Sequence, residues 1–122
     1  MDIERLKDDI VMVLEDKKAL DIEVLKVAEK TMLAEYFIIA SGSSNTQVKA
    51  LVDDVLFEIS EKYNIKPHQV ENDSGNRWNV LDYRDIVVHI FYHEEREFYQ
   101  LEKLWHGPLS VDVVDEINNS NK

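Results

Sequence analysis

Two short, uninterrupted apolar runs limit the folds that this chain of 122 residues can adopt. The first is AEYFIIAS, residues 34–41, followed by Gly42, and the second is IVVHIFY, residues 86–92. A short run that is apolar on both faces is typical of a strand buried inside a sheet. We therefore expect both runs to be interior strands of one sheet.

Two further segments have the three- and four-residue spacing that places apolar side chains on one face of a helix. Residues 2–18 predict a first helix, with Asp2 as its capping residue. Residues 44–63 predict a longer helix, because Ser44 and Gln47 have the spacing of a capping box at its start. The apolar stripes consist of Ile3, Leu6, Ile10, Val13 and Leu14 in the first helix, and of Val48, Leu51, Val52, Val55, Leu56, Ile59 and Tyr63 in the second.

The remaining patterns complete the order of elements. Residues 21–31 alternate loosely and contain β-branched side chains, which favours a strand. The segment RWNVLDYRDIVVHIFY, residues 77–92, predicts two strands joined at residues 82–85. Helical spacing returns over residues 94–105. The resulting α-β-β-α-β-β-α order predicts an α/β fold, in which helices flank a mixed β-sheet.

The chain is expected to form one domain, because 122 residues are enough to bury a core of their own. A Gly-Pro pair at residues 107–108 stops the last predicted helix, and a polar run ends the sequence. We therefore expect a single domain over residues 1–108 and a loose tail over residues 109–122.

The charge balance favours some partners over others. The sequence has 25 Asp and Glu against 14 Lys and Arg, a formal charge of −11. This charge opposes close contact with bare phosphate backbone, so direct nucleic-acid binding is disfavoured. The same field accelerates encounter with a basic protein, for example a ribosomal protein.

The sequence contains no cysteine. This excludes disulfides, thiolate catalysis and cysteine-ligated zinc. The first residues carry scattered acids and no apolar run of membrane-spanning length, so we expect neither a secretory signal nor a membrane span. A cytoplasmic location is the corresponding expectation.

Candidate catalytic residues have simpler structural explanations. The segment IIASGSSNTQ, residues 38–47, reads as a strand, a Gly-Ser loop and the start of a helix, a layout that can present backbone amides to an anion. It lacks the Gly spacing and the Lys of a phosphate-binding loop. A nucleotidyltransferase that opens in this way needs two carboxylates one residue apart on a strand, sharing magnesium. Asp53 and Asp54 are adjacent within a predicted helix instead, which indicates a solvated face.

Acidic and histidine side chains cluster around the predicted hairpin. Asp82 and Asp85 could form an acid/base or metal pair, but Asp at the ends of a tight turn also accepts backbone amide bonds, and we favour this role. Asp85, His89 and His93 share one strand face and could hold zinc, yet the two imidazoles are spread over ~13 Å of strand. We expect a hydrogen-bonded, structural His89 and neither a metal nor a cofactor.

Aromatic residues are concentrated in one stretch, with Arg residues beside them. Such clusters are enriched where proteins bind proteins. Phe98 and Trp105 have the spacing of core residues, whereas Tyr99 and Trp78, which precedes a Val80 expected to be buried, are candidates for partial exposure. The cluster contains Trp78, Tyr83, Phe91, Tyr92, Phe98, Tyr99 and Trp105, beside Arg77, Arg84 and Arg96.

The same stretches resemble the ribosomal silencing factor family, also called Iojap-like. The matching segments, between about residues 18 and 105, are KALDIEVLKV, EYFIIASGSSNTQVKALVDDV and RWNVLDYRDIVVHIFYHEEREFYQLEKLW. The resemblance implies an α/β fold related to nucleotidyltransferases without their catalytic carboxylates, and a non-enzymatic role. It also implies binding to protein fourteen of the large ribosomal subunit, steric prevention of subunit joining and, in some members, homodimers.

The resemblance assigns partner-binding residues as well. The family usually has Gly in the turn where this chain has Arg84, which predicts another turn type or a modest strain cost. It usually has Glu-Gly at Glu71-Asn72, and Asn is expected to keep the left-handed conformation of that loop. The residues that match the family's invariant Trp, its Leu-Asp-Tyr-Gly-Asp turn and its Arg and Tyr near the last helix are Trp78, Asp82, Tyr83, Asp85, Arg96 and Tyr99.

Three functions follow from these observations, and the first is favoured. A translation repressor would present the matched residues to a basic ribosomal protein. A nucleotide- or metal-dependent enzyme of nucleotidyltransferase-like fold would use Ser43, Asp82, Asp85 and His89. An adaptor would dock another basic protein on its acidic helices.

Overall fold

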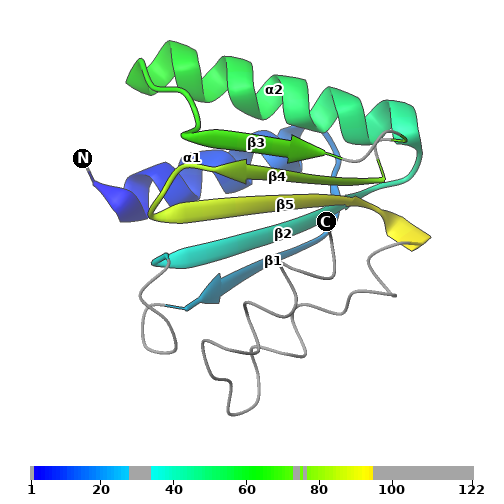
Figure 1. The fold of residues 1–122 in the computed structure, drawn as a ribbon, viewed down its shortest axis with the longest axis horizontal. Helices are drawn as coiled ribbons and strands as arrows, with labels where there is room; N and C mark the ends of the chain where they lie inside the picture. Colours follow the sequence, from blue (N-terminus) through cyan, green and yellow to red (C-terminus); the bar gives the residue numbers. More distant parts are fainter. Residues whose placement is uncertain (1, 28–33, 73–74, 76, 95–122) are drawn as a thin grey trace.

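The computed structural model describes residues 2–27, 34–72, 75 and 77–94 of the chain. Within these ranges no helix is long and apolar enough to cross a membrane. Of the helix predicted over residues 94–105 only residue 94 is described, and the tail over residues 109–122 lies outside the described part. The described elements are α1 (Ile3–Asp16), β1 (Leu20–Lys26), β2 (Tyr36–Gly42), α2 (Asn45–Tyr63), β3 (Gln69–Asn72), β4 (Trp78–Asp82) and β5 (Ile86–Tyr92) (Figure 1).

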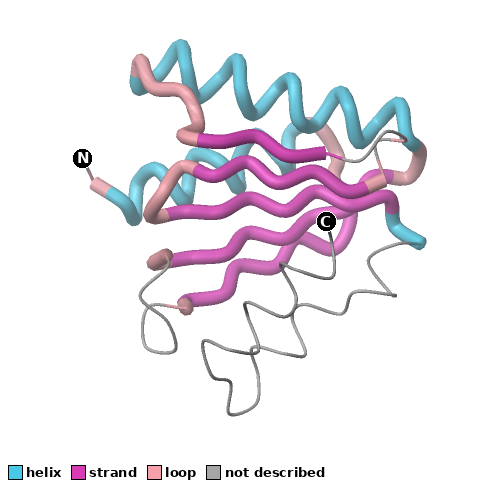
Figure 2. The backbone as a smooth tube through the Cα atoms, in the orientation of Figure 1, coloured by secondary structure: helices cyan, strands magenta, loops and turns pink. Residues whose placement is uncertain are grey.

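The strands form one mixed sheet in the order β1-β2-β5-β4-β3 (Figure 2). β2 and β5 pair in parallel, whereas the other neighbouring strands pair antiparallel. The two apolar runs therefore occupy interior positions, and every residue of β2 is buried. The prediction of an α/β fold with two interior strands in a mixed sheet is confirmed.

Both described helices pack on the same face of the sheet. The stripe residues Ile10 of α1 and Val55 of α2 are 0% exposed and lie in one core cluster with the strands. We define the helix face by its strand residues Tyr36, Ile38, Ala40, Leu81, Ile86, Val88 and Ile90. The opposite face, called the second face, is defined by Leu25, Val27, Ala34, Phe37, Ile39 and Phe91, with Trp78 and Val87 packed against them.

The helix ends follow the predicted capping. The Asp2 carboxylate accepts an amide hydrogen bond from the first turn of α1 at 3.2 Å, and the Ser44 hydroxyl accepts the Gln47 N–H at 3.1 Å. The side-chain oxygen of Gln47 accepts the amide of Ser43 at 2.6 Å, one residue earlier than a capping box predicts. Asn64 ends α2 in the left-handed conformation with a φ of 56°.

Gly42 lets the end of β2 approach the start of α2. A Cβ atom at this position would lie 2.7 Å from Val48 Cγ2 and 2.9 Å from the Val48 backbone nitrogen. A side chain can adopt another rotamer to relieve such a clash, but a backbone nitrogen cannot. A larger residue at position 42 would therefore displace α2.

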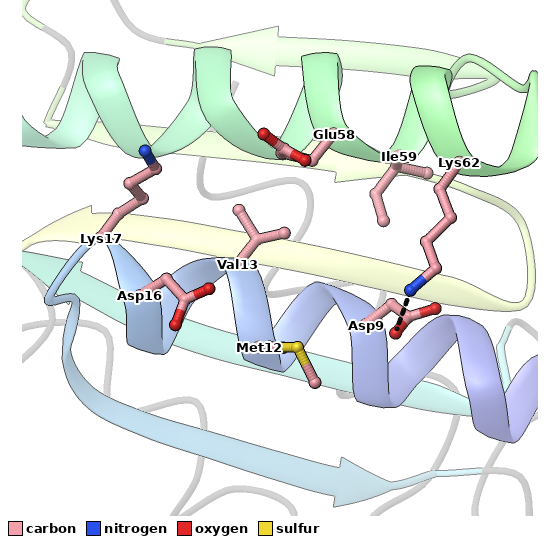
Figure 3. A pocket seen from close by; sticks show the side chains of 8 residues that line it. All are labelled: Asp9, Met12, Val13, Asp16, Lys17, Glu58, Ile59 and Lys62. Carbon is pink, nitrogen blue, oxygen red and sulfur yellow. Dashed lines mark hydrogen bonds and ion pairs between the residues drawn. The ribbon is translucent and has the colours of Figure 1, made fainter.

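A nearly buried carboxylate links the two helices. Asp9 of α1 is 9% exposed and accepts a hydrogen bond from Lys62 Nζ at 3.0 Å (Figure 3) and a short one from the Tyr63 hydroxyl. The bond from Tyr63, and after it the bond from Lys62, lowers the pKa of Asp9, although burial opposes the shift. Burial, together with the bond to Asp9, raises the pKa of Tyr63 to about 12.

β3 has no counterpart among the elements predicted from the sequence. This strand pairs with β4, and all of its residues are exposed. Glu71 and Asn72, expected in a loop, form its second half, and Asn72 is not among the described residues with positive φ. The left-handed conformation predicted for Asn72 is therefore wrong. The described order is α-β-β-α-β-β-β, because this extra strand precedes the predicted hairpin.

Val80 of β4 was expected to be buried, but the most deeply buried residues of this strand lie on its other face. Val80 is half-buried, whereas Asn79 and Leu81 are 1% and 0% exposed. The alternation of a strand directs Leu81 to the helix face and Val80 to the second face. A strand with an apolar residue on each face does not reveal which face is more deeply covered.

Candidate functional site

The β4–β5 hairpin carries most of the predicted site residues, and hydrogen bonds hold its turn. The Asp82 carboxylate accepts the amide N–H of Arg84 at 2.7 Å. The Tyr83 N–H donates to the Ile86 carbonyl at 2.9 Å, and the Asp85 N–H donates to the Tyr83 carbonyl at 3.0 Å. Asp82 therefore has the turn role that was favoured from its position.

Arg84 adopts a left-handed backbone conformation with a φ of 73°. A residue with a Cβ atom is less stable there than Gly, at a cost on the order of 1 kcal/mol. The strain expected from the replacement of Gly is thus present, and the bond to Asp82 helps to hold it. The replacement also places a guanidinium beside His68, with Arg84 Nη2 and His68 Nδ1 3.1 Å apart.

Asp85 fastens the turn to the neighbouring strand through its backbone. Its carbonyl accepts the amides of Glu35 at 2.7 Å and Tyr36 at 3.1 Å, at the start of β2. The residue is exposed. A rigid turn therefore presents the Asp85 carboxylate to solvent.

Tyr83 lies inside the protein. It is 8% exposed and belongs to the core cluster of the helix face. Its hydroxyl is buried and has no hydrogen-bond partner among the described residues. Burial raises the pKa of Tyr83 to about 12, so the hydroxyl keeps its proton at neutral pH. The buried ring supports the turn from beneath.

Trp78 lies half-buried at the margin of the second face, as predicted. The register of β4 and β5 places Trp78 opposite Phe91 and Asp82 opposite Val87, so the indole and the carboxylate share this face. Four strand residues, about 13 Å, separate the two side chains, so each is a separate candidate contact. A partly exposed aromatic ring is a side chain that protein interfaces favour.

His89 lies in an aromatic environment on the second face. Its ring centre is 4.9 Å from that of Phe37 and 6.3 Å from that of Phe91. The residue is 6% exposed, and neither ring nitrogen has a hydrogen-bond partner within the described part of the chain. The hydrogen bonds predicted for His89 are therefore not formed there. Burial lowers its pKa to about 4, so the ring is neutral at pH 7.

The other candidates lie apart from the hairpin turn or outside the described residues, and in the described ranges no group of three or more His, Asp or Glu could hold a metal ion. Asp53 pairs with Lys49 at 3.3 Å on the exposed side of α2, as expected of a solvated face. The Ser43 amide in the Gly-Ser loop is bonded to Gln47, which fits a capping turn. Arg96 and Tyr99 lie outside the described residues.

Several hollows mark the described surface. One of about 210 Å³ lies between α1 and α2, where Asp9 and Lys62 line it (Figure 3). Another, of about 520 Å³, lies between α2 and β3, and the exposed Phe57 and Val70 line it.

A hollow beside the hairpin turn, which we call the turn hollow, has a volume of about 520 Å³. Its apolar lining consists of Ile3, Leu6, Ile65 and Tyr83, and its polar lining of Lys66, His68, Arg84 and Asp85. Lys66 and His68 were not predicted as site residues, because nothing in their spacing connects them to Arg84 of the turn, at least 16 residues further along the chain.

These features define a class of protein: an α/β protein with a mixed sheet, helices on one face, and a rigid hairpin that presents a ring and a carboxylate. The whole chain, residues 1–122, matches the protein family described as "Ribosomal silencing factor during starvation". The chain therefore belongs to the ribosomal silencing factor family, which confirms the resemblance seen in its sequence.

Individual relatives agree with this assignment. The chain is 37% identical over 99 residues to the ribosomal silencing factor of Bacillus subtilis, covering 81% of this chain and 83% of that protein. A crystal structure of a protein from Chromobacterium violaceum has a TM-score of 0.82 and 34% identity, covering 88% of each chain. Mouse "Mitochondrial assembly of ribosomal large subunit protein 1" is 32% identical over 100 residues, covering 80% of this chain and 44% of that protein. Membership of this family implies ribosome-associated regulation of translation.

Proposed function

We propose that this chain is a non-enzymatic translation repressor that binds the large ribosomal subunit through its protein fourteen and sterically prevents the small subunit from joining. The family and the names of its members support a ribosome-associated, regulatory role. The formal charge of −11 supports a basic protein as the partner. Steric exclusion requires no turnover, no metal and no cofactor, and the proposed location is the cytoplasm.

The observation that carries the proposal is the half-buried Trp78 on a hairpin whose turn exposes Asp85. Hydrogen bonds already fix this turn, so little ordering entropy is lost when a partner binds. Asp82 contributes the turn geometry, and Tyr83 supports it from the core. The family resemblance adds Arg96 and Tyr99 to the proposed surface.

Sedimentation with purified large subunits and with intact ribosomes tests the mechanism. We expect the protein to sediment with free large subunits, less strongly as salt rises, because electrostatic attraction is screened. With intact ribosomes the protein should stay in the supernatant, because the joined small subunit covers the face of the large subunit to which the protein binds. Equal binding to both particles would contradict steric exclusion.

Substitution of Trp78 tests the placement of the interface. Trp78→Ala should weaken large-subunit binding by about 2 kcal/mol or more, roughly thirtyfold, because central aromatic residues dominate interface energies. Phe57→Ala is the matched control, because Phe57 is an aromatic residue of α2 that is 60% exposed. Retention of large subunits by Trp78→Ala at the wild-type level would refute this placement.

Self-association is a further part of the proposal, taken from the homodimers of some family members. Sedimentation velocity of the free protein over a concentration series measures it. A single monomer boundary at all concentrations would remove the homodimer from the proposal and leave subunit binding untouched.

A further inference from the structure

Hydrogen-bond donors gather at the turn hollow although the chain is strongly acidic. Lys66 and His68 follow α2, Arg84 comes from the hairpin turn, and all three are exposed. A guanidinium can only donate, so the contact of 3.1 Å between Arg84 Nη2 and His68 Nδ1 makes Nδ1 the acceptor. The hydrogen of the neutral imidazole is then on Nε2. The hollow thus offers an ammonium, a guanidinium and an imidazole N–H.

One residue holds the two halves of this donor set together. The Asp82 carbonyl accepts the N–H of His68 at 2.7 Å, and the Asp82 carboxylate accepts the N–H of Arg84 at 2.7 Å. The backbones that carry the donors are therefore fixed relative to each other before any ligand arrives. Preorganisation of this kind reduces the entropy lost on binding.

The rest of the hollow is suited to an uncharged, planar body. Ile3 and Ile65, both half-buried, supply aliphatic surface beside the buried Leu6, and the nearly buried Tyr83 adds the edge of an aromatic ring whose hydroxyl has no partner among the described residues. Asp85 supplies an exposed acceptor. The volume of about 520 Å³ is in the range of sites that hold small organic ligands.

We propose that the turn hollow binds a nucleoside monophosphate. Lys66 and Arg84 match the two negative charges of a phosphate monoester, and His68 Nε2 adds a third donor. Asp85 repels a bare anion but accepts hydrogen bonds from ribose hydroxyls or a base amino group. The aliphatic side chains cover one face of the base. Binding at this site requires no ribosome, so it is independent of the proposed function.

Isothermal titration calorimetry of the full chain with adenosine monophosphate and with inorganic phosphate tests the site. We expect one molecule of the nucleotide per chain, bound more tightly than phosphate. Lys66→Gln and Arg84→Asn should each weaken nucleotide binding about tenfold, because each removes a charge-assisted contact. Asn tolerates the left-handed backbone at this position. Lys49→Gln is the control, because it removes an exposed charge from α2, outside the hollow.

Several results would overturn the proposal. No heat with either probe at low millimolar concentration excludes the site, and equal affinity for both probes removes the role of the apolar lining. Equal weakening by Lys49→Gln shows that net charge alone governs binding. Amide NMR spectra guard against misfolded variants: in the wild-type protein, the nucleotide should shift the signals of His68 and Arg84, and shifts confined to other regions contradict this location.

Discussion

The centres of the two sheet faces are filled by different kinds of side chain. Aliphatic residues of α1, α2 and the strands predominate on the helix face, beside Tyr36 and Tyr83, whereas the rings of Phe37, His89 and Phe91 lie together on the second face. Both kinds of packing remove apolar surface from water. The second face also carries Trp78 at its margin, half-buried. Under the proposed function, the helix face serves stability, whereas the second face serves both stability and recognition.

Two neighbouring residues of β2 lie on opposite faces of the sheet, so substituting each one tests the two roles separately. We expect the largest changes in stability from these substitutions. Ile38 points to the helix face and Ile39 to the second face, and both are 0% exposed. Either residue changed to Ala should lower the free energy of unfolding by about 2–5 kcal/mol, measured by urea denaturation. Only Ile39→Ala should also weaken large-subunit binding by the folded protein, because Ile39 belongs to the cluster that supports Trp78. Equal binding by the two variants would contradict the division of roles.

The pH dependence of the free energy of unfolding should report the titration of His89, which lies on the second face. Folded His89 titrates at about 4, against an ordinary pKa of 6.5, so the unfolded state takes up the proton first as the pH falls. Its contribution is complete above pH 6.5 and should decrease by about 3 kcal/mol on acidification to pH 4. His89→Leu should abolish this decrease in urea unfolding measured across that range.

His93→Gln, which changes an exposed histidine and keeps His89, is the control variant and should retain the decrease that His89 causes. Because the ring nitrogens of His89 have no partners among the described residues, His89→Leu should also be at least as stable as wild type at pH 7. A large loss of stability at that pH would show that the ring is needed for packing.

Asp9 should have a smaller effect, in a different pH range. Its folded pKa is lowered, so its contribution is present above the ordinary value of 3.8 and is lost as the pH falls through the lowered pKa. Asp9→Asn should cost on the order of 1 kcal/mol at neutral pH, because Lys62 is half exposed and solvent screens the pair. Asp8→Asn, an exposed neighbour on α1, should change stability less. Equal acid profiles for Asp9→Asn and wild type would exclude this role.

The start of α2 should give a similarly small effect without any change in binding. Ser44→Ala removes the acceptor for the Gln47 amide and should cost about 1 kcal/mol of stability. Thr46→Ala, in the exposed first turn, is the control. Weaker large-subunit binding by folded Ser44→Ala would mean that the helix side of the molecule also takes part in recognition.

The long periodic elements could be predicted from the sequence, and β3 could not. The apolar stripes of α1 and α2 and the apolar runs of β2 and β5 each indicate their secondary structure from the local spacing of apolar residues. Residues 69–72 contain one apolar side chain, Val70, and all four are exposed. Their extended conformation depends on pairing with β4, where Val70 lies opposite Leu81, and such a tertiary contact has no local sequence signature.

The candidate site was predictable only where its contacts join residues that are close in the sequence. The turn role of Asp82 followed from the preference of short carboxylates for backbone amides. The turn hollow was not predictable, because Lys66 and Arg84 line one hollow only once residues 68 and 82 are hydrogen-bonded. Among the described residues His89 lacks its predicted partners, because the rings of Phe37 and Phe91 lie beside it where a polar group was expected.

The parallel pairing of β2 with β5 has a consequence for how the chain folds. Residues 43–85 separate these two strands, whereas β4 and β5 are joined by a short turn. Because closing a long loop costs entropy before any contact compensates it, the hairpin should form before the central pair. Higher φ-values for Leu81→Ala than for Ile38→Val would be the kinetic sign of this order. Until β5 docks, the edge of β2 is open to other chains, so the strand pair that is most protected in the native state is the most vulnerable to aggregation during folding.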